Sequence, residues 1–280
     1  MKASGALWTM IHGDCTEVLP TLGAVTHCIS DPPYEADAHT KARRTLKGGG
    51  SQLARKFEVR RIDAPIGIDF SAMDPATRAA LATYCGEHVE RWSMAFCQIE
   101  AVGTWRAAFE AAHLDWVRGM FWHKPNGSPQ FTGDRPAQAG ECIALAHPKR
   151  KKRWNGGGSR GFFEFNLEHA TGGGEGPNEH PTMKPLALML RLVELFTDPG
   201  DLVLDPFAGS GTTGLACVRL GRRFVGIERQ EKYFRLSCER LRAEEAGTTV
   251  QAARAGQAAL FGGTDNLAGS MKHVQEGPTE

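Results

Sequence analysis

A glycine-rich turn between a predicted strand and a predicted helix constrains the fold more than any other feature of this sequence. The segment Asp205-Pro-Phe-Ala-Gly-Ser-Gly-Thr-Thr-Gly214 follows the apolar run Asp201–Leu204 and leads into Thr213–Leu220, whose pattern is typical of a helix that ends at Gly221. Glycine tolerates the backbone angles of a tight turn and lets a ligand approach the main chain closely. Phe224–Ile227 then predicts the next strand. This strand–helix–strand order predicts an α/β fold with a parallel sheet.

The rest of the chain repeats the alternation of strands and helices. Helices are predicted at Met73–Arg91, with Asp74 as N-cap and Pro75 as the first helical residue, and at Gly103–Ala112, Pro185–Phe196 and Gln230–Glu245. Strands are predicted at Leu7–Asp14, Val25–Ser30, Ser93–Ile99, Trp116–Trp122 and Ala139–Ala146. Because neighbouring parallel strands need crossover connections, we expect one mostly parallel sheet with helices on both faces.

Composition narrows the class of protein only slightly. With 41% hydrophobic and 23% charged residues, the 280-residue chain is typical of a soluble globular protein, and its formal net charge of +1 indicates no particular partner. The 7 cysteines form no Cys-x-x-Cys pair, so we expect buried free thiols and no metal site. No apolar stretch approaches the ~18 residues of a membrane span. We therefore expect a cytoplasmic protein with no membrane partner.

The glycine turn is compatible with two cofactors. Gly209, Gly211 and Gly214 match the pattern G-x-G-x-x-G, which fits a nicotinamide dinucleotide as well as S-adenosylmethionine. A pyrophosphate needs backbone N–H donors and no nearby anion, whereas Asp205 adds an anion and Pro206 lacks an N–H. A carboxylate suits the cationic amino group and sulfonium of S-adenosylmethionine. The turn therefore favours S-adenosylmethionine, and a nicotinamide-dependent oxidoreductase is a distant alternative.

A second motif, Asp31-Pro32-Pro33-Tyr34, follows the predicted strand Val25–Ser30. It should lie at the carboxyl end of that strand, where open α/β sheets bind ligands. The exocyclic amine of a base is a poor nucleophile because its lone pair is delocalised into the ring. The Asp31 carboxylate and the Pro32 carbonyl could accept hydrogen bonds from both of its N–H groups, and Tyr34 could stack on the base. The motif predicts chemistry on a base amine.

Together these motifs resemble the amino-methyltransferases of DNA, in particular the group with permuted motif order that is often called beta. The matching segments are Ile11-His-Gly-Asp-Cys15, Ser30-Asp-Pro-Pro-Tyr34, His180-Pro-Thr-Met-Lys-Pro185, Asp205-Pro-Phe-Ala-Gly-Ser-Gly-Thr-Thr213 and Gly226-Ile-Glu228. In this group Asp-Pro-Pro-Tyr precedes the glycine turn, as it does here. The resemblance implies a single Rossmann-like methyltransferase domain at 1–246, with a mostly parallel sheet, helices on both faces, an antiparallel edge hairpin and inserted basic loops.

The resemblance also implies roles for individual residues. The target base would be held by Asp31, Pro32, Pro33 and Tyr34. The cofactor would be bound by Asp14, Cys15, Asp31, Lys184, Asp205, Pro206, Phe207, Ala208, Gly209, Ser210, Gly211, Thr212, Thr213 and Glu228. Glu228 would accept hydrogen bonds from the ribose hydroxyls, and Asp14 and Cys15 would lie against the adenine. Lys184 would pair with the cofactor carboxylate. The alternative interpretation is that Lys184 is a solvated lysine at the start of a helix.

The first residue of the Asp-Pro-Pro-Tyr motif bears on the target base. In the group that this chain resembles, an aspartate there favours adenine N6 and a serine favours cytosine N4. Ser30 precedes the motif, but the aligned position is Asp31, so we expect an adenine-N6 methyltransferase that flips its target out of double-stranded DNA. Cytosine-N4 methylation is the first alternative. A DNA-binding module with a vestigial cofactor site is a distant one, which must explain why Asp31, Tyr34 and Glu228 are intact.

Two basic segments are predicted to contact DNA phosphates, because lysine and arginine supply most of the affinity for a duplex. They are Arg43, Arg44 and Lys47 in a basic mobile loop at 35–62, and Lys149, Arg150, Lys151, Lys152 and Arg153 in a target-recognition insert at 124–180. We expect neutralisation of Lys149–Arg153 to weaken DNA binding and to flatten its salt dependence.

The C-terminal segment 247–280 is rich in glycine and alanine, which predicts an extended or disordered tail. Within it, Gln257-Ala-Ala-Leu-Phe261 resembles the short peptide that docks in bacterial sliding clamps. The alternative is that Leu260 and Phe261 pack back on the domain. The resemblance further implies a bacterial or phage protein that could form a homodimer.

Overall fold

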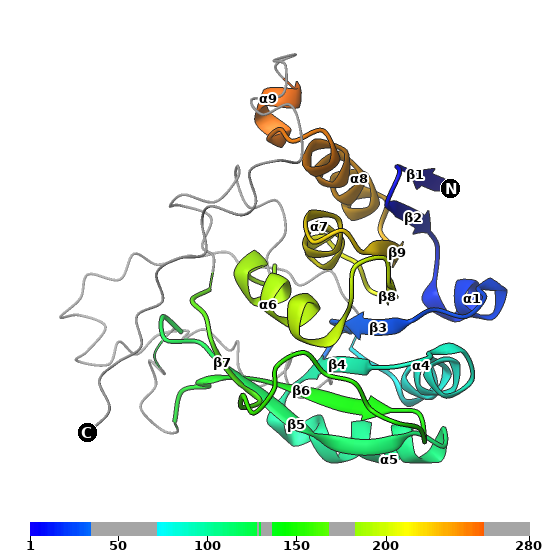
Figure 1. The fold of residues 1–280 in the computed structure, drawn as a ribbon, viewed down its shortest axis with the longest axis vertical. Coiled ribbons are helices and arrows are strands. Elements are labelled where there is room, and N and C mark those ends of the chain that lie inside the picture. Colours follow the sequence, from blue (N-terminus) through cyan, green and yellow to red (C-terminus); the bar gives the residue numbers. More distant parts are fainter. Residues whose placement is uncertain (35–71, 128, 130–135, 168–182, 255–280) are drawn as a thin grey trace, which may run out of the picture.

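The computed structural model describes residues 1–34, 72–127, 129, 136–167 and 183–254. The described residues form a nine-stranded sheet with the strand order β1-β2-β9-β8-β3-β4-β6-β5-β7 (Figure 1). The strands are β1 (Lys2–Ser4), β2 (Trp8–His12), β3 (His27–Ser30), β4 (Ser93–Cys97), β5 (Asp115–His123), β6 (Gly140–His147), β7 (Phe162–Glu164), β8 (Leu202–Asp205) and β9 (Arg223–Glu228). Among the described strands, β1 and β6 run in the direction opposite to all the others, so the predicted mostly parallel sheet with an antiparallel edge hairpin is confirmed.

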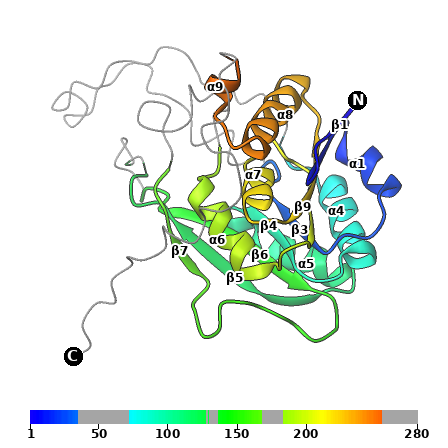
Figure 2. The same cartoon turned by 45° about the horizontal axis from the view of Figure 1, so that its top comes forward.

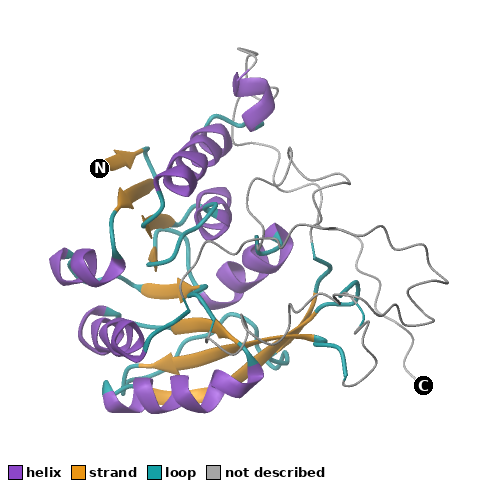
Figure 3. Cartoon of the chain, turned by 180° about the vertical axis from the view of Figure 1, so that it is seen from behind, coloured by secondary structure: helices purple, strands orange, loops and turns teal. Residues whose placement is uncertain are grey.

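Helices cover both faces of the sheet, as predicted (Figures 2 and 3). They are α1 (Cys15–Val18), α4 (Pro75–His88), α5 (Val102–Ala111), α6 (Leu186–Phe196), α7 (Thr212–Arg219), α8 (Glu231–Glu245) and α9 (Val250–Arg254), with 3-10 turns at Leu19–Thr21 and Ile99–Ala101. One face packs against α6, α7 and α8, and the other against α1, α4 and α5.

Side chains of the central strands alternate between two apolar cores because successive residues of a strand point to opposite faces. Ile29 and Met94 pack with Leu192 beneath α6, whereas Cys28 and Ala95 pack beneath α4 and α5. All residues of β3, β4 and β6 are buried, which is typical of strands that are covered on both faces. All 7 cysteines are buried and free, as the sequence predicted.

Two helix boundaries show how local sequence fixes the elements. Asp74 caps α4, since its carboxylate accepts a hydrogen bond from the Thr77 backbone N–H at 2.9 Å, and Pro75 is the first helical residue. Gly221 follows α7 with a φ of 72°, a left-handed conformation that favours glycine. Both boundaries were predicted.

The structure corrects one boundary. The short helix α9, with Ala252 buried, occupies the beginning of the segment predicted as an extended tail. Within the predicted target-recognition insert at 124–180, the expected strand is present as β6, which lies in the sheet between β4 and β5, and the role of the insert stays a prediction. The predicted basic loop at 35–62 and the segment Gln257–Phe261 lie outside the described residues.

The sheet has a topological switch point between β8 and β3. From β3 the chain passes through α4 to β4, whereas from β8 it passes through α7 to β9 on the other side. The carboxyl ends of these parallel strands lie at one edge, here called the carboxyl edge, and their amino ends at the opposite, amino edge. Ligands in open α/β sheets bind at the carboxyl edge beside such a switch point. In the described residues, helices that are long and apolar enough to cross a membrane are absent.

Candidate active site

The motif Asp31–Tyr34 leaves the sheet beside the glycine turn. Strand β3 pairs in parallel with β8, with Cys28 opposite Leu204, so Asp31 and Asp205 emerge at the carboxyl edge from neighbouring strands. The negative charge of Asp31 is among the causes that raise the pKa of Asp205, after burial as the largest cause. The fold therefore brings together the two motifs that are far apart in the sequence.

Lys184 reaches the same point from the segment before α6. Its Nζ lies 2.5 Å from Asp31 Oδ2 and 3.3 Å from the nearer carboxylate oxygen of Glu141. It also donates to the Tyr34 hydroxyl at 3.5 Å and lies 5.1 Å from the centre of the Phe96 ring. The side chain is 9% exposed, so Lys184 is a buried member of the site and not a solvated lysine at a helix start.

Glu141 is a site residue that the sequence analysis missed. It is the second residue of β6, which begins at the carboxyl edge because it runs antiparallel to β4. Its Oε1 pairs with Lys124, which follows β5, and its Oε2 faces Lys184. A single acid in a strand whose 8 residues are all buried was the available signal. We call Asp31, Tyr34, Lys124, Glu141 and Lys184 the carboxyl-edge cluster.

Charges within the carboxyl-edge cluster compensate one another. Burial raises the pKa of Asp31, and Glu141 adds to that rise against the opposing effect of Lys184. Burial alone would raise the pKa of Glu141, but Lys184 and Lys124 outweigh it and lower that pKa. Burial would lower the pKa of Lys184, but the two carboxylates outweigh it and raise that pKa. Two cations thus face two anions in a site of low polarity.

The glycine turn is held by two carboxylates. Asp205 accepts hydrogen bonds from the Phe207 backbone N–H at 3.1 Å and from the Thr213 hydroxyl at 2.6 Å. Glu228, at the end of β9, accepts from the Gly209 N–H at 2.9 Å and from the Gln230 N–H at 2.7 Å. These bonds connect the turn to the ends of β8 and β9.

Glycine is required at several points of this turn. Gly209 and Gly211 have φ values of 51° and 82°, in the left-handed region that other residues rarely adopt. A Cβ at Gly214 would lie 2.7 Å from the Phe224 ring, so this glycine allows α7 to pack closely on β9. The three positions serve turn geometry and close packing.

Burial makes the two carboxyl groups of the turn weaker acids than exposed carboxyl groups. It raises the pKa of Asp205 to about 7 and also raises the pKa of Glu228. A cation bound beside either carboxylate would lower its pKa again. The site is therefore better suited to a positively charged ligand than to a pyrophosphate.

Asp14 and Cys15 lie at the same edge. The Gly13 N–H donates to the Glu228 backbone carbonyl at 3.0 Å, which places the turn into α1 beside the end of β9. Asp14 caps α1 by accepting from the Thr16 N–H at 2.9 Å. Cys15 is buried, and burial raises the pKa of its thiol to about 12, so it is an inert apolar contact at neutral pH.

Two buried oxygens of the site, Ser30 Oγ and Asp31 Oδ1, have no hydrogen-bond partner among the described residues, whereas Glu141 Oε2 has the ion pair with Lys184. An unpaired buried acceptor costs about 1–3 kcal/mol, so such atoms mark places where a ligand donor fits. The Asp31 side chain is still 26% exposed. The unpartnered Asp31 Oδ1 could accept a hydrogen bond from an amine substrate. The buried carboxylates of the neighbouring turn suit a cofactor with a positively charged sulfonium.

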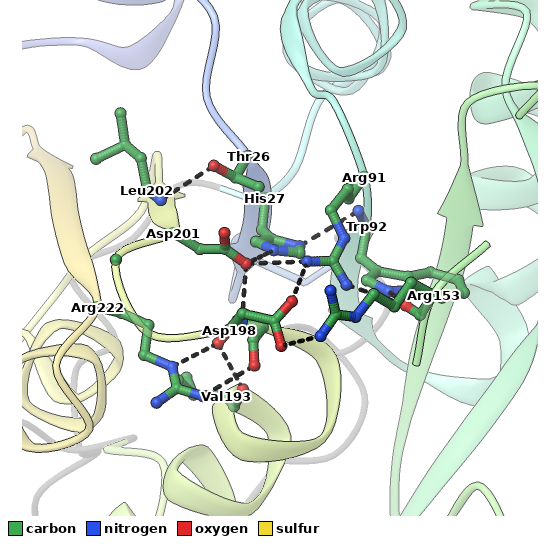
Figure 4. A network of polar contacts seen from close by, with 12 residues as sticks. Thr26, His27, Arg91, Trp92, Arg153, Val193, Asp198, Asp201, Leu202 and Arg222 are labelled. Carbon is green, nitrogen blue, oxygen red and sulfur yellow. Dashed lines mark hydrogen bonds and ion pairs between the residues drawn. The ribbon is translucent and has the colours of Figure 1, made fainter. Parts of the chain in front are cut away.

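The structure does not bring the second basic segment to this site. Strand β6 ends at the amino edge, so Lys149–Arg153 follows it on the far side of the sheet from Asp31. Lys152 pairs with Asp115 at 2.8 Å, and Arg153 pairs with Asp198 at 3.1 Å (Figure 4). The segment is therefore separated from the candidate active site, and its contact with DNA phosphates stays a prediction. The other predicted basic residues, Arg43, Arg44 and Lys47, lie outside the described part of the chain.

Residues 25–239 match the family model N6_N4_Mtase, which is described as DNA methylase. The chain belongs to this DNA methylase family. The match confirms the family that the motifs indicated and disfavours the nicotinamide-dependent alternative. The segment matched includes both the Asp31–Tyr34 motif and the glycine turn.

Two bacterial methylases are similar in sequence. The type II methyltransferase M.HinfI of Haemophilus influenzae is 28% identical over 265 residues, which cover 84% of this chain and 68% of the relative. The type II methyltransferase M2.DpnII of Streptococcus pneumoniae is 31% identical over 153 residues, covering 49% of this chain and 55% of the relative. The chain thus spans between about half and two thirds of these methylases.

Solved structures of DNA methylases share the fold. The M1.HpyAVI–SAM complex superposes with a TM-score of 0.59 at 25% identity and covers 84% of this chain and 100% of that one. The cytosine-N4-specific PvuII DNA methyltransferase has a TM-score of 0.63 at 14% identity, over 91% of this chain and 95% of that one. The second likeness shows the fold alone, and the predicted fold class is confirmed.

Proposed function

We propose that this DNA methylase transfers a methyl group from S-adenosylmethionine to N6 of an adenine in double-stranded DNA. S-adenosylmethionine is the methyl donor of the family and is bound in the M1.HpyAVI complex. The observation that carries the proposal is the position of Asp31, whose free Oδ1 lies at the carboxyl edge beside the Asp205–Thr213 turn. Acceptor and cofactor turn then share one site.

The cofactor would lie across the ends of β8, β9 and β2. Each oxygen of Glu228 accepts one backbone N–H, and a carboxylate oxygen can accept a second bond, which leaves capacity for the ribose hydroxyls. Lys184 has three N–H donors. Two face the carboxylates of Asp31 and Glu141, and the third makes only a long contact of 3.5 Å with the Tyr34 hydroxyl, which the cofactor carboxylate could replace. Asp14 and Cys15 would contact the adenine ring from the turn before α1.

The target base would be flipped out of the duplex so that its amine reaches Asp31. The Asp31 carboxylate and the Pro32 carbonyl accept from the two N–H groups, which favours a tetrahedral nitrogen with its lone pair toward the methyl group. Tyr34 supplies a face for stacking. After transfer the nitrogen carries one proton too many. Asp31 is suited to receive it because burial raises its pKa.

Cytosine-N4 methylation is the second candidate, because the fold is shared with a cytosine-N4 enzyme. Aspartate rather than serine at position 31 favours adenine. Both reactions need the same geometry at the amine.

Nucleoside mass spectrometry separates the two candidates. Double-stranded DNA that has been incubated with the protein and S-adenosylmethionine is digested, and its nucleosides are analysed. We expect N6-methyladenine with the native chain and far less of it with Asp31→Ala. N4-methylcytosine would correct the base, and DNA binding without any methylated nucleoside would identify a DNA-binding module with a vestigial site.

A further inference from the structure

Glu141 stands out among the buried residues of β6. It shares its side of the strand with Ile143 and Leu145, which pack in the apolar core beneath α6. A carboxylate at the end of this apolar row costs free energy unless its charge is compensated. The contacts of the Glu141 carboxylate show how its charge is compensated.

Both oxygens of Glu141 are engaged by lysines from different parts of the chain. Lys124 contacts Oε1 and lies 4.5 Å from the centre of the Trp122 ring, on the strand paired with β6. Lys184 lies 3.3 Å from Oε2. Tyr34 also acts as a hydrogen-bond partner that lowers the pKa of Glu141. The carboxylate is thus fixed by three side chains.

This arrangement controls how Lys184 meets Asp31. Lys184 is shared between two carboxylates, with the Asp31 contact on Oδ2 and Asp31 Oδ1 without a partner among the described residues. Without Glu141, the lysine would be free to shift towards Asp31 and cover the second oxygen. Tyr34 would also lose the acceptor that fixes its hydroxyl.

We propose that Glu141 is a positioning residue for methyl transfer, which holds Lys184 and Tyr34 so that Oδ1 of Asp31 remains open to the amine of the target base. The role rests on the proposed methyl transfer to a base amine but not on which base is methylated. Glu141 acts through Lys184 and Tyr34, and needs no contact with substrate.

The test is Glu141→Gln, which keeps the shape of the side chain and removes its charge. Turnover, measured as labelled methyl transferred to DNA of any sequence, should fall about 10²-fold, the effect expected when reacting groups are misplaced by about 1 Å. The affinity for S-adenosylmethionine, measured by calorimetry, should change less than twofold. A fall in turnover without loss of cofactor affinity separates positioning from a binding role.

The pH profile of turnover gives a second readout. The charged or titratable groups that face Asp31 are Lys184, Glu141, Lys124, Tyr34 and Asp205. Turnover requires ionised Asp31, and Glu141 raises the Asp31 pKa whereas Lys184 lowers it. The acid limb should therefore move to lower pH in Glu141→Gln and to higher pH in Lys184→Met. A purely structural role would move both limbs together or neither.

A matched control is Glu164→Gln, at the carboxyl end of β7. Its side chain is 59% exposed and pairs with His123, so turnover and pH profile should stay unchanged. If Glu141→Gln folds poorly, Glu141→Asp keeps the charge and should restore the native acid limb. Native turnover and profile in Glu141→Gln would overturn the role. If the native chain methylates cytosine, only the identity of the target base is corrected and the role of Glu141 stands. If the native chain transfers no methyl group, both the proposed function and the role of Glu141 are overturned.

Discussion

The two edges of the sheet carry polar clusters of similar composition but opposite character. At the amino edge, His27, Arg91, Arg153, Asp198 and Asp201 form what we call the amino-edge network (Figure 4). At the carboxyl edge, the carboxyl-edge cluster combines Asp31, Tyr34, Lys124, Glu141 and Lys184. Both place ionised groups in partly or wholly buried positions.

The amino-edge network is saturated. Asp201 Oδ2 accepts from the Nε2 of His27 at 2.8 Å, from Arg91 at 3.0 Å and from the Asp198 backbone N–H at 2.8 Å. His27 Nδ1 accepts from the Trp92 N–H at 3.4 Å, which assigns the ring proton to Nε2. These bonds connect the starts of β3, β4 and β8.

The carboxyl-edge cluster differs because its acceptors are not all used. Asp31 Oδ1 has no hydrogen-bond partner in the described residues, and Glu141 Oε2 has only the 3.3 Å ion pair with Lys184. A saturated network contributes to stability, whereas an open acceptor costs stability and is available to a substrate. The comparison predicts that substitutions in the carboxyl-edge cluster lower methyl transfer, whereas substitutions in the amino-edge network lower the free energy of unfolding.

The largest effect should follow Asp31→Ala. Removal of the acceptor for the base amine should lower methyl transfer about 10²–10³-fold, as removal of one preorganised hydrogen-bonding group does in other enzymes. The unfolding midpoint in urea should remain near that of the native chain, because Lys184 keeps Glu141 as its partner. Native turnover in Asp31→Ala would show that the carboxyl-edge cluster is not the site of methyl transfer.

Asp201→Asn should show the reverse behaviour. We expect unfolding free energy to fall by about 1–3 kcal/mol, because His27 and Arg91 lose a charged acceptor. Turnover per folded molecule at 25 °C, measured alongside urea unfolding, should stay within about twofold of the native value. Asp201 and Asp31 lie at opposite edges of the sheet and share no partner in the part of the chain that the structure describes, so a change at one should leave the other unaffected. A large loss of turnover in the folded variant would show that the two edges are coupled.

Acidification below about pH 6.5 should lower the free energy of unfolding through the amino-edge network. Burial lowers the pKa of His27 below its ordinary value of 6.5, with Asp201 opposing, so the folded protein keeps this ring neutral. A depressed histidine pKa contributes stability above pH 6.5 that is lost as pH falls through the folded-state pKa, at no more than about 1.4 kcal/mol per pH unit. Urea unfolding at several pH values would measure this slope, which should be flatter between pH 7 and 5 in His27→Gln.

The smallest effect should come from replacement of Lys149, Arg150 and Lys151 by glutamine. These residues follow β6 at the amino edge, away from Asp31. The slope of the logarithm of DNA affinity against the logarithm of salt concentration should therefore change by less than about 0.9, the value of one phosphate contact. Fluorescence anisotropy over a salt series would measure it. A clearly flatter slope would support the contact that the sequence pattern alone predicted.

Much of the fold and the core of the site followed from local patterns. The Asp31–Tyr34 motif directly after β3, the glycine turn directly after β8 and Glu228 at the end of β9 were predicted because consecutive residues fix strand ends and turns. Glu141 was not found, although it is the single acid of β6, because its lysine partners come from other segments.

The basic segment Lys149–Arg153 shows the limit of such patterns most clearly. Its charge is visible in the sequence, but its place depends on the direction of β6, which sequence periodicity does not reveal. Alternation of side chains is the same in parallel and antiparallel strands. The sequence therefore could not show at which edge the segment lies.

For this protein the sequence by itself determined the local chemistry: a carboxylate followed by two prolines and a tyrosine, a glycine turn, and an acid one strand further on. Tertiary structure decided which of these groups meet, because strand order and direction set the neighbours of each strand end. Backbone angles act between adjacent residues, whereas pairing of Asp31, Glu141 and Lys184 depends on three segments packing together.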